Sequence, residues 1–289
     1  MDICGHIPTR ERLTRIAALE VVPQSFLFSG PRRLGKFLVA LEFAEKLSGT
    51  VFLDGVPHPD LLVIGRVDKG ASDDSVKRPG FSVVEVRQAE EFLSRFPTRG
   101  KYRVVIIDEA DRLTLSAENA LLKMLEEPNS TSVIILVTHR PARLLSTVRS
   151  RLFAVSFGPV PSSELHRFFP NGNVPEFFLS LGLPGLIVEA LRDPGEFEQK
   201  KEFLRGLFSL SRLSWSQRLA LAEKLANDSK DLSDLLEIWL SGLARQRTGQ
   251  LAQSVAFAGF LESGLETLDR VTEKEGNSRL LLEKLFTAV

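Results

Sequence analysis

The most restrictive feature of the chain is a glycine-rich loop between a short apolar run and a helical pattern. The run Ser25–Ser29 (SFLFS) leads into Gly30, Gly35 and Lys36, which have the spacing of the phosphate-binding loop G-x-x-x-x-G-K-[ST]. Phe37 stands where that motif has Ser or Thr. The apolar residues that follow recur about every third position, which predicts a helix. A strand–loop–helix unit of this kind favours a parallel sheet flanked by helices.

Further apolar runs repeat this alternation along the first half of the chain. They lie near Leu62, at Tyr102–Asp108 and at Ser132–Thr138, with helical patterns at Glu85–Arg95 and Ser116–Glu127. Strands without polar alternation are typical of a parallel sheet that has helices on both faces. We therefore predict an α/β core whose ligands bind outside the carboxyl ends of the strands.

The apolar runs stop after about residue 158. A Pro-rich break follows, in which Ser162 or Ser163 is predicted to cap a helix, and two short helical patterns come next. From Glu196 onwards the pattern is helical throughout. We predict an α/β core at 1–158, a small helical part at 159–195 and an all-α domain at 196–289.

Composition excludes several classes of function. Lys and Arg balance Asp and Glu at 37 each, so no overall field attracts nucleic acid, and any DNA contact has to come through a local patch or an assembly. The single cysteine, Cys4, excludes a disulfide framework and a Cys-based zinc cluster. There is no apolar run of membrane length and no signal peptide, so we expect a cytoplasmic protein. Trp215 and Trp239 are interpreted as core or interface anchors.

Asp108 and Glu109 end the apolar run that starts at Tyr102. In a nucleotide hydrolase, an acid at a strand tip orders Mg²⁺ and the next carboxylate polarises the attacking water. A solvated acidic turn is the alternative interpretation. Thr138 ends the next run, where it is predicted to contact a terminal phosphate or the attacking water.

A third group of candidate residues is basic. Arg151 lies in the sequence Ser-Arg-Leu, and its forked guanidinium suits stabilisation of phosphoryl charge across a subunit boundary. Arg149 is interpreted as a solvated surface charge. Glu126 and Glu127 end a predicted helix, where the macrodipole disfavours negative charge by about 0.3–1 kcal/mol each. We expect a basic side chain to pair with them.

These runs together resemble one family. The segment DEADRLTLSAENALLKMLEEP, followed by an apolar run and LLSTVRSRLF, resembles the δ′ subunits of the bacterial DNA polymerase III clamp loader, which belong to the AAA+ proteins. The resemblance implies an AAA+ core, a helical lid and a helical collar. It also implies a ring of five subunits, including ATPase subunits and δ, that loads the sliding clamp onto primed DNA.

The resemblance further implies roles for individual residues. The family's Ser-Arg-Cys motif falls on Ser150, Arg151 and Leu152, so Arg151 is expected to reach the ATP of a neighbouring subunit. Many relatives carry a four-Cys zinc module after the first helix of the core. The segment Ser48–Asp60 has no cysteine, so no zinc is expected.

Phe37 decides the expected activity. A hydroxyl at this position would ligate Mg²⁺, and a phenyl ring has no oxygen. Arg32, Arg33 and the loop amides can still attract phosphate, so weak binding of ATP, ADP or phosphate is expected without a required cofactor. Leu186 or an apolar neighbour stands where AAA+ ATPases often carry a γ-phosphate-sensing arginine. We predict a subunit that does not hydrolyse ATP.

Two other hypotheses stay open. Lys36, Asp108 and Glu109 are compatible with an active AAA+ ATPase subunit of a clamp loader or of a related DNA replication or repair ATPase. A stand-alone scaffold without a role in replication is the third.

Overall fold

The computed structural model describes residues 3–52, 56–65, 80–170, 176–228, 232–246, 255–272 and 275–288. These residues form two compact units, which divide between Ile187 and Val188. The first unit contains the sheet and the second is built from helices. Among the described helices, none is both long and apolar enough to cross a membrane. The predicted boundaries at 158 and 195 stay predictions.

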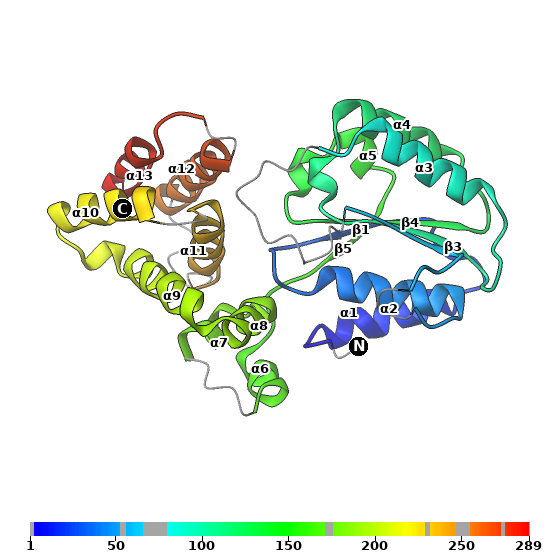
Figure 1. The fold of residues 1–289 in the computed structure, drawn as a ribbon, viewed down its shortest axis with the longest axis horizontal. Coiled ribbons are helices and arrows are strands. Elements are labelled where there is room, and N and C mark those ends of the chain that lie inside the picture. The colour runs from blue at the N-terminus through cyan, green and yellow to red at the C-terminus, as the bar shows by residue number, and fades with distance from the viewer. Residues whose placement is uncertain are drawn as a thin grey trace. The chain divides into compact units, whose positions relative to one another are not determined.

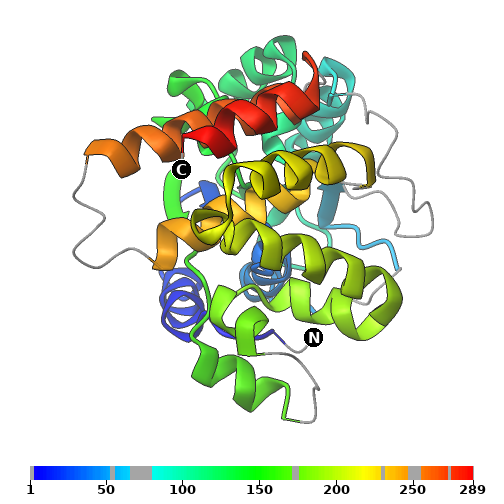
Figure 2. The ribbon, with the colours of Figure 1, turned by 90° about the vertical axis from the view of Figure 1, so that its left-hand side faces the viewer.

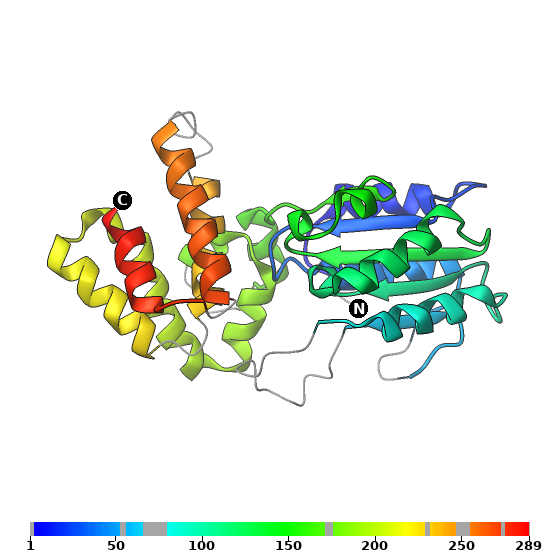
Figure 3. The same ribbon diagram turned by 90° about the horizontal axis from the view of Figure 1, so that it is seen from above.

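Five parallel strands form the sheet of the first unit. They are β1 (Ser25–Ser29), β2 (Leu61–Ile64), β3 (Arg103–Ile107), β4 (Ser132–Thr138) and β5 (Phe153–Ser156), in the order β2-β3-β4-β1-β5. Figure 3 shows neighbouring strands running in the same direction. Ser29 pairs with Thr138 on one side and with Ser156 on the other, so three strands end level. The edge strand β5 is one that the apolar runs did not predict.

Helices cover both faces of this sheet, as predicted. The helices α1 (Ile7–Ala17) and α2 (Lys36–Ser48) lie on one face, and α3 (Val83–Ser94), α4 (Leu115–Glu126) and α5 (Ser146–Arg149) lie on the other (Figure 1). Every residue of β3 and β4 is buried, which explains why both strands are apolar apart from Arg103 at the start of β3 and Ser132 and Thr138 at the two ends of β4. Local signals set the helix starts, because Ser82 and Glu85 form a capping box at α3 and the Thr114 hydroxyl caps α4. The α/β fold is confirmed.

Three shorter helices follow the sheet: α6 (Ser162–Phe168), α7 (Glu176–Leu181) and α8 (Pro184–Arg192). Leu165, Leu179 and Ile187 from these helices pack with Cys4 of the N-terminal segment in one buried cluster. Burial raises the pKa of the Cys4 thiol to about 11, so this side chain acts as a small apolar group. The expected serine cap is wrong, because α6 begins at Ser162 after Pro161 and no side chain caps it.

The second unit continues with α9 (Pro194–Phe208), α10 (Trp215–Asp228), α11 (Leu232–Gln246), α12 (Val255–Thr272) and α13 (Ser278–Thr287). Figure 2 looks onto these helices, with α13 beside α12. Trp239 is 1% exposed and meets Phe260 and Phe286 edge-on, at ring-centroid distances of 5.8 and 6.0 Å. Trp215 is 60% exposed, so only Trp239 of the two tryptophans lies in this core.

Candidate functional site

A cavity of about 180 Å³ lies at the carboxyl ends of β1, β3 and β4. Its lining residues are Arg32, Arg33, Leu34, Gly35, Lys36, Phe37, Asp108, Glu109, Val137, Thr138 and His139. The structure therefore brings together the predicted nucleotide-site residues, apart from Gly30, which does not line the cavity. Arg151 lies elsewhere. The volume is below the roughly 300–1,000 Å³ that is typical of ligand pockets.

Lys36 closes the glycine-rich loop onto itself. Its ammonium group donates hydrogen bonds to the carbonyl oxygens of Gly30, at 2.7 Å, and Pro31, at 2.6 Å. The residue is 7% exposed, so this arrangement is buried. In a loop loaded with nucleotide, the same ammonium group contacts the β- and γ-phosphates. An incoming phosphate would have to compete with two carbonyl groups for it.

Contacts from outside the loop hold its backbone in place. The His6 ring donates from Nε2 to the Leu34 carbonyl at 2.9 Å, and the Gly185 amide donates to the Arg33 carbonyl at 2.8 Å. Gly30 packs so closely that a Cβ atom there would lie 2.3 Å from the Phe157 carbonyl oxygen. Burial lowers the pKa of His6, which favours the neutral ring. The N-terminal segment and α8 thus fix the loop, and the sequence pattern did not predict His6 as part of it.

Phe37 lines the cavity as a half-buried side chain in the first turn of α2. It is the residue that would face a metal ion between phosphates, and it offers carbon atoms only. In the described part of the chain, no group of three or more His, Cys, Asp or Glu side chains is placed to hold a metal ion. Arg32 and Arg33 contribute basic side chains to the lining, and Arg33 has a left-handed backbone with φ 64°.

The two acidic residues that follow β3 have partners within the chain. The Asp108 carboxylate accepts a hydrogen bond from the Glu109 amide at 3.0 Å. The Glu109 carboxylate forms an ion pair with Arg112 at 2.6 Å, and the Arg112 guanidinium packs over the Phe81 ring at 4.8 Å from its centroid. The carboxylate that would polarise water in an ATPase is therefore engaged by an arginine three residues further along.

Thr138 ends β4 as predicted, but its hydroxyl has a protein partner. It donates to Asp111 Oδ1 at 2.6 Å, and His139 Nδ1 lies 3.3 Å from the same oxygen. Burial by itself raises the pKa of Asp111, but the hydrogen bonds from His139 and Thr138 outweigh it and hold that pKa well below its usual range. Asp111 therefore stays charged and orients both neighbours. The sequence motifs did not predict Asp111 or His139, although His139 directly follows Thr138 and Asp111 lies two residues after Glu109.

Arg151 lies just after α5, outside the cavity. Its guanidinium pairs through Nη2 with Glu126 at 2.8 Å and donates from Nη1 to the Thr147 carbonyl at 3.0 Å. Arg151 is therefore the expected basic partner of Glu126, whereas Glu127 has no ion pair within the described residues. Arg149 is exposed and has no ion pair within the described residues, which agrees with its interpretation as a surface charge.

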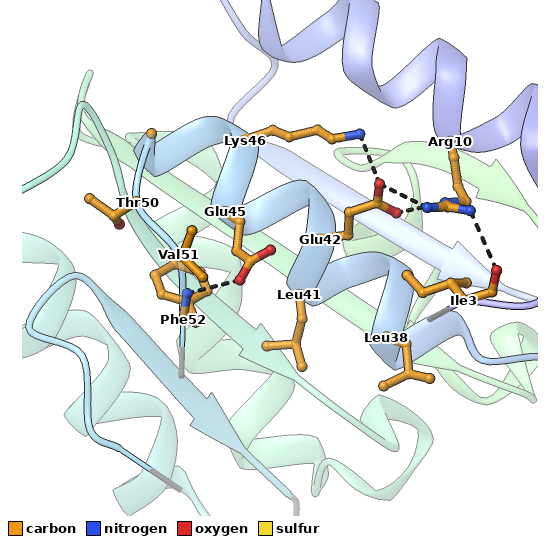
Figure 4. Close-up of a pocket in the computed structure, with 11 residues that line it drawn as sticks. Ile3, Arg10, Leu38, Leu41, Glu42, Glu45, Lys46, Thr50, Val51 and Phe52 are labelled. Atoms are coloured by element: carbon orange, nitrogen blue, oxygen red, sulfur yellow. Dashed lines mark hydrogen bonds and ion pairs between the residues drawn. The ribbon is translucent and has the colours of Figure 1, made fainter. Parts of the chain in front are cut away.

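A larger cavity, of about 400 Å³, lies along α2 on another part of the first unit (Figure 4). Its charged groups pair with one another, because Glu42 contacts both Arg10 at 2.7 Å and Lys46 at 2.9 Å. Glu45 accepts a hydrogen bond from the Phe52 amide at 2.8 Å. None of the residues predicted from motifs lines this cavity.

The parallel five-stranded sheet with helices on both faces, the phosphate-loop motif between β1 and α2, and the small helices after β5 agree with the AAA+ fold expected from the sequence. Among solved structures, the DNA polymerase III gamma subunit-related protein of Thermotoga maritima has a similar fold, with a TM-score of 0.53. The two chains are 22% identical, and the alignment covers 96% of this chain and 97% of the other.

The family described as "DNA polymerase III, delta subunit" matches residues 6–161, more than half of the chain, and the chain belongs to this family. DNA polymerase III subunit delta′ of Pseudomonas aeruginosa is 27% identical over 208 residues, in an alignment that covers 64% of this chain and 61% of that relative. The subunit of the same name from Bacillus subtilis is 32% identical over 142 residues, in an alignment that covers 47% of this chain and 42% of the relative. The chain thus matches less than two thirds of the length of either relative.

Proposed function

We propose that the chain is a δ′-type clamp-loader subunit that does not hydrolyse ATP itself and supplies Arg151 to the ATP of a neighbouring subunit. The observation that carries the proposal is Phe37. A phenylalanine at this position lacks the hydroxyl that would ligate Mg²⁺. In the same loop, the Lys36 ammonium group donates hydrogen bonds to the Gly30 and Pro31 carbonyl groups. Membership of the DNA polymerase III family supports the setting, which is assistance in loading a sliding clamp onto primed DNA.

The rest of the cavity supports the same proposal. Glu109 is paired with Arg112, and the Thr138 hydroxyl donates to Asp111, so two further groups expected to act on Mg·ATP are engaged. The basic residues Arg32 and Arg33 still favour an anion. We therefore expect weak binding of ATP, ADP or phosphate, with no required cofactor and no zinc.

The partners in this proposal are the other subunits of a five-membered ring, namely the ATPase subunits and δ. The helices of the second unit would form the collar that holds the subunits together. The chain has no net charge, so primed DNA and the clamp would be met through the assembly and its local patches. The assembly would act in the cytoplasm.

A reconstituted clamp loader tests the role of Arg151. Arg151→Ala should lower clamp- and DNA-stimulated ATP hydrolysis by at least ~10-fold, because an arginine finger contributes about 10³–10⁵ in well-studied GTPases. Arg149→Ala removes an equal charge two residues away, from a side chain with no ion pair within the described residues, and should keep the wild-type rate. Equal rates for wild type and Arg151→Ala would reject the proposal.

The presence of Lys36, Asp108 and Glu109 in one cavity supports a second candidate, an active AAA+ ATPase subunit. Hydrolysis of Mg·ATP by the isolated chain separates the two. Turnover that Lys36→Ala abolishes would favour the ATPase. Background rates for both wild type and Lys36→Ala are the result that the non-hydrolysing subunit requires.

A further inference from the structure

We propose that Glu126 is a positioning residue for Arg151, whose carboxylate holds the guanidinium in the orientation used toward a neighbouring subunit's phosphate. This inference rests on the proposed function of Arg151 and adds a second residue to it. It starts from the ion pair between Arg151 Nη2 and Glu126 Oε1 at 2.8 Å.

The guanidinium is held along part of its edge only. Nη2 contacts Glu126, and Nη1 donates to the Thr147 carbonyl at 3.0 Å. A guanidinium has five N–H groups, so these two contacts leave others to donate to a ligand. The Arg151 side chain is 38% exposed, so its remaining donors can be reached from outside. Arg151 is thus restrained and available at the same time.

The helix α4 restrains the whole segment that carries Arg151, and it does so at two points. The buried carboxylate of Glu118 accepts a hydrogen bond from the Leu145 amide at 2.7 Å, directly before α5. Leu144 and Val148 pack into the same buried cluster as Leu121 of α4. The backbone of the segment is therefore fixed, and the long Arg151 side chain is the part with freedom left. Glu126, the last residue of α4, restrains that side chain.

The pair fits a positioning role better than a permanent lock. An arginine side chain has many rotamers, and restraining them beforehand reduces the entropy lost when it engages a ligand. Both partners are substantially exposed, so solvent screens their attraction and the guanidinium can shift toward a phosphate. The position of Glu126 is itself disfavoured by the helix dipole, so this residue gains from a nearby cation.

The test uses the reconstituted complex with Glu126→Ala, Glu126→Gln and the matched control Glu127→Ala. Glu127 is the adjacent exposed glutamate, and it has no ion pair within the described residues. We expect Glu126→Ala to lower kcat for stimulated ATP hydrolysis about fivefold at unchanged KM, equivalent to about 1 kcal/mol. Glu126→Gln keeps an acceptor oxygen and should retain at least half of the rate. Glu127→Ala should match wild type.

The double variant Glu126→Ala/Arg151→Ala separates positioning from a general structural effect. If Glu126 acts through Arg151, the double variant should match Arg151→Ala alone, because residues that work as a unit are not additive. The inference would be overturned if the fold-losses of the two single variants multiplied in the double variant. It would also be overturned by a wild-type or faster rate for Glu126→Ala, or by an equal loss of rate in Glu127→Ala. So would failure of Glu126→Gln to assemble into the complex. If Arg151→Ala left the rate of stimulated ATP hydrolysis unchanged, that result would instead reject the proposed function.

Discussion

The amide of Gly185, at the start of α8, donates a hydrogen bond to the carbonyl of Arg33 in the phosphate-loop motif at 2.8 Å. The contact is close, because a Cβ atom at Gly185 would lie 2.9 Å from the Arg33 Cβ and 3.0 Å from its Cα and carbonyl oxygen. The start of α8 is therefore attached directly to the backbone of the loop.

Gly185→Ala should destabilise the first unit by about 1–3 kcal/mol, because the added methyl group meets backbone atoms that cannot easily move. The measurement is the midpoint of urea unfolding of the isolated chain. Amide hydrogen exchange reports which part of this unfolding belongs to the first unit. Gly158→Ala is the control, because a Cβ atom there meets nothing within 4 Å. Equal midpoints for the two variants would contradict the close contact.

Phe37→Thr should give the cavity a Mg²⁺-dependent affinity for ATP that we expect the wild-type chain to lack, because it returns the hydroxyl that the phosphate-loop motif provides. Calorimetric titration with ATP, in Mg²⁺ and in EDTA, measures the gain. Phe37→Leu removes the ring without adding an oxygen, so it should show no such gain. Tight Mg·ATP binding by the wild-type chain would remove the basis of this prediction.

Asp60 is a buried carboxylate that organises the turn before β3. It accepts hydrogen bonds from the amides of Thr98, Arg99 and Gly100 at 2.6, 2.6 and 2.9 Å, and Arg103 lies 3.6 Å away. Asp60→Ala should cost about 3–5 kcal/mol in the free energy of unfolding, because it leaves buried donors and a buried charge without their partner. Glu91→Ala, which breaks an exposed ion pair with Arg95, should cost roughly 0.3–0.5 kcal/mol.

The Asp60 effect should also depend on pH. Burial alone raises the pKa of Asp60, but the three backbone hydrogen bonds and Arg103 outweigh it, so the net pKa is lowered. A lowered pKa means that the charged carboxylate stabilises the fold at neutral pH and that this contribution is lost as the pH falls through the folded-state value. The difference between wild type and Asp60→Ala should therefore shrink below pH ~4. A difference that grows with acid would contradict the assignment.

Glu118 should show the opposite dependence. Burial raises the pKa of its carboxyl group, with the hydrogen bond from the Leu145 amide opposing in part. A raised pKa means that the stabilising contribution is complete in acid and is lost as the pH rises from about 4.3 through the folded-state value. Unfolding free energies of wild type and Glu118→Gln should be compared across this range. The wild-type chain should lose stability relative to the variant as the pH rises, and the reverse trend would exclude a raised pKa.

The sequence predicted the sheet core well, because burial on both faces leaves a simple signal. The runs at Ser25–Ser29 and Ser132–Thr138 are strands with those bounds. The helix α1 was missed because it is mostly polar and buries only Leu13 and Ile16. The edge strand β5 was missed because it has four residues, of which Val155 alone is buried.

The candidate site was predicted as a set of residues but not as a set of contacts. Motif spacing placed Lys36, Asp108 and Thr138 at one edge of the sheet, and they line one cavity. It could not show that Asp111 holds the Thr138 hydroxyl, because that hydrogen bond joins β4 to the turn after β3. Nor could it predict the contact of His6 with the loop, which links distant segments and follows no motif.

The phosphate-loop motif of this chain has a structural role. Gly30 closely approaches the Phe157 carbonyl, and Lys36 forms two hydrogen bonds inside the loop. Any side chain at Gly30 would collide with the backbone of Phe157. Loss of the Lys36 ammonium group would leave the carbonyl oxygens of Gly30 and Pro31 without this donor. Folding is therefore a sufficient reason to keep both residues. Glycine and lysine at this spacing therefore do not by themselves indicate ATP hydrolysis, and the residue after the lysine has to be considered with them.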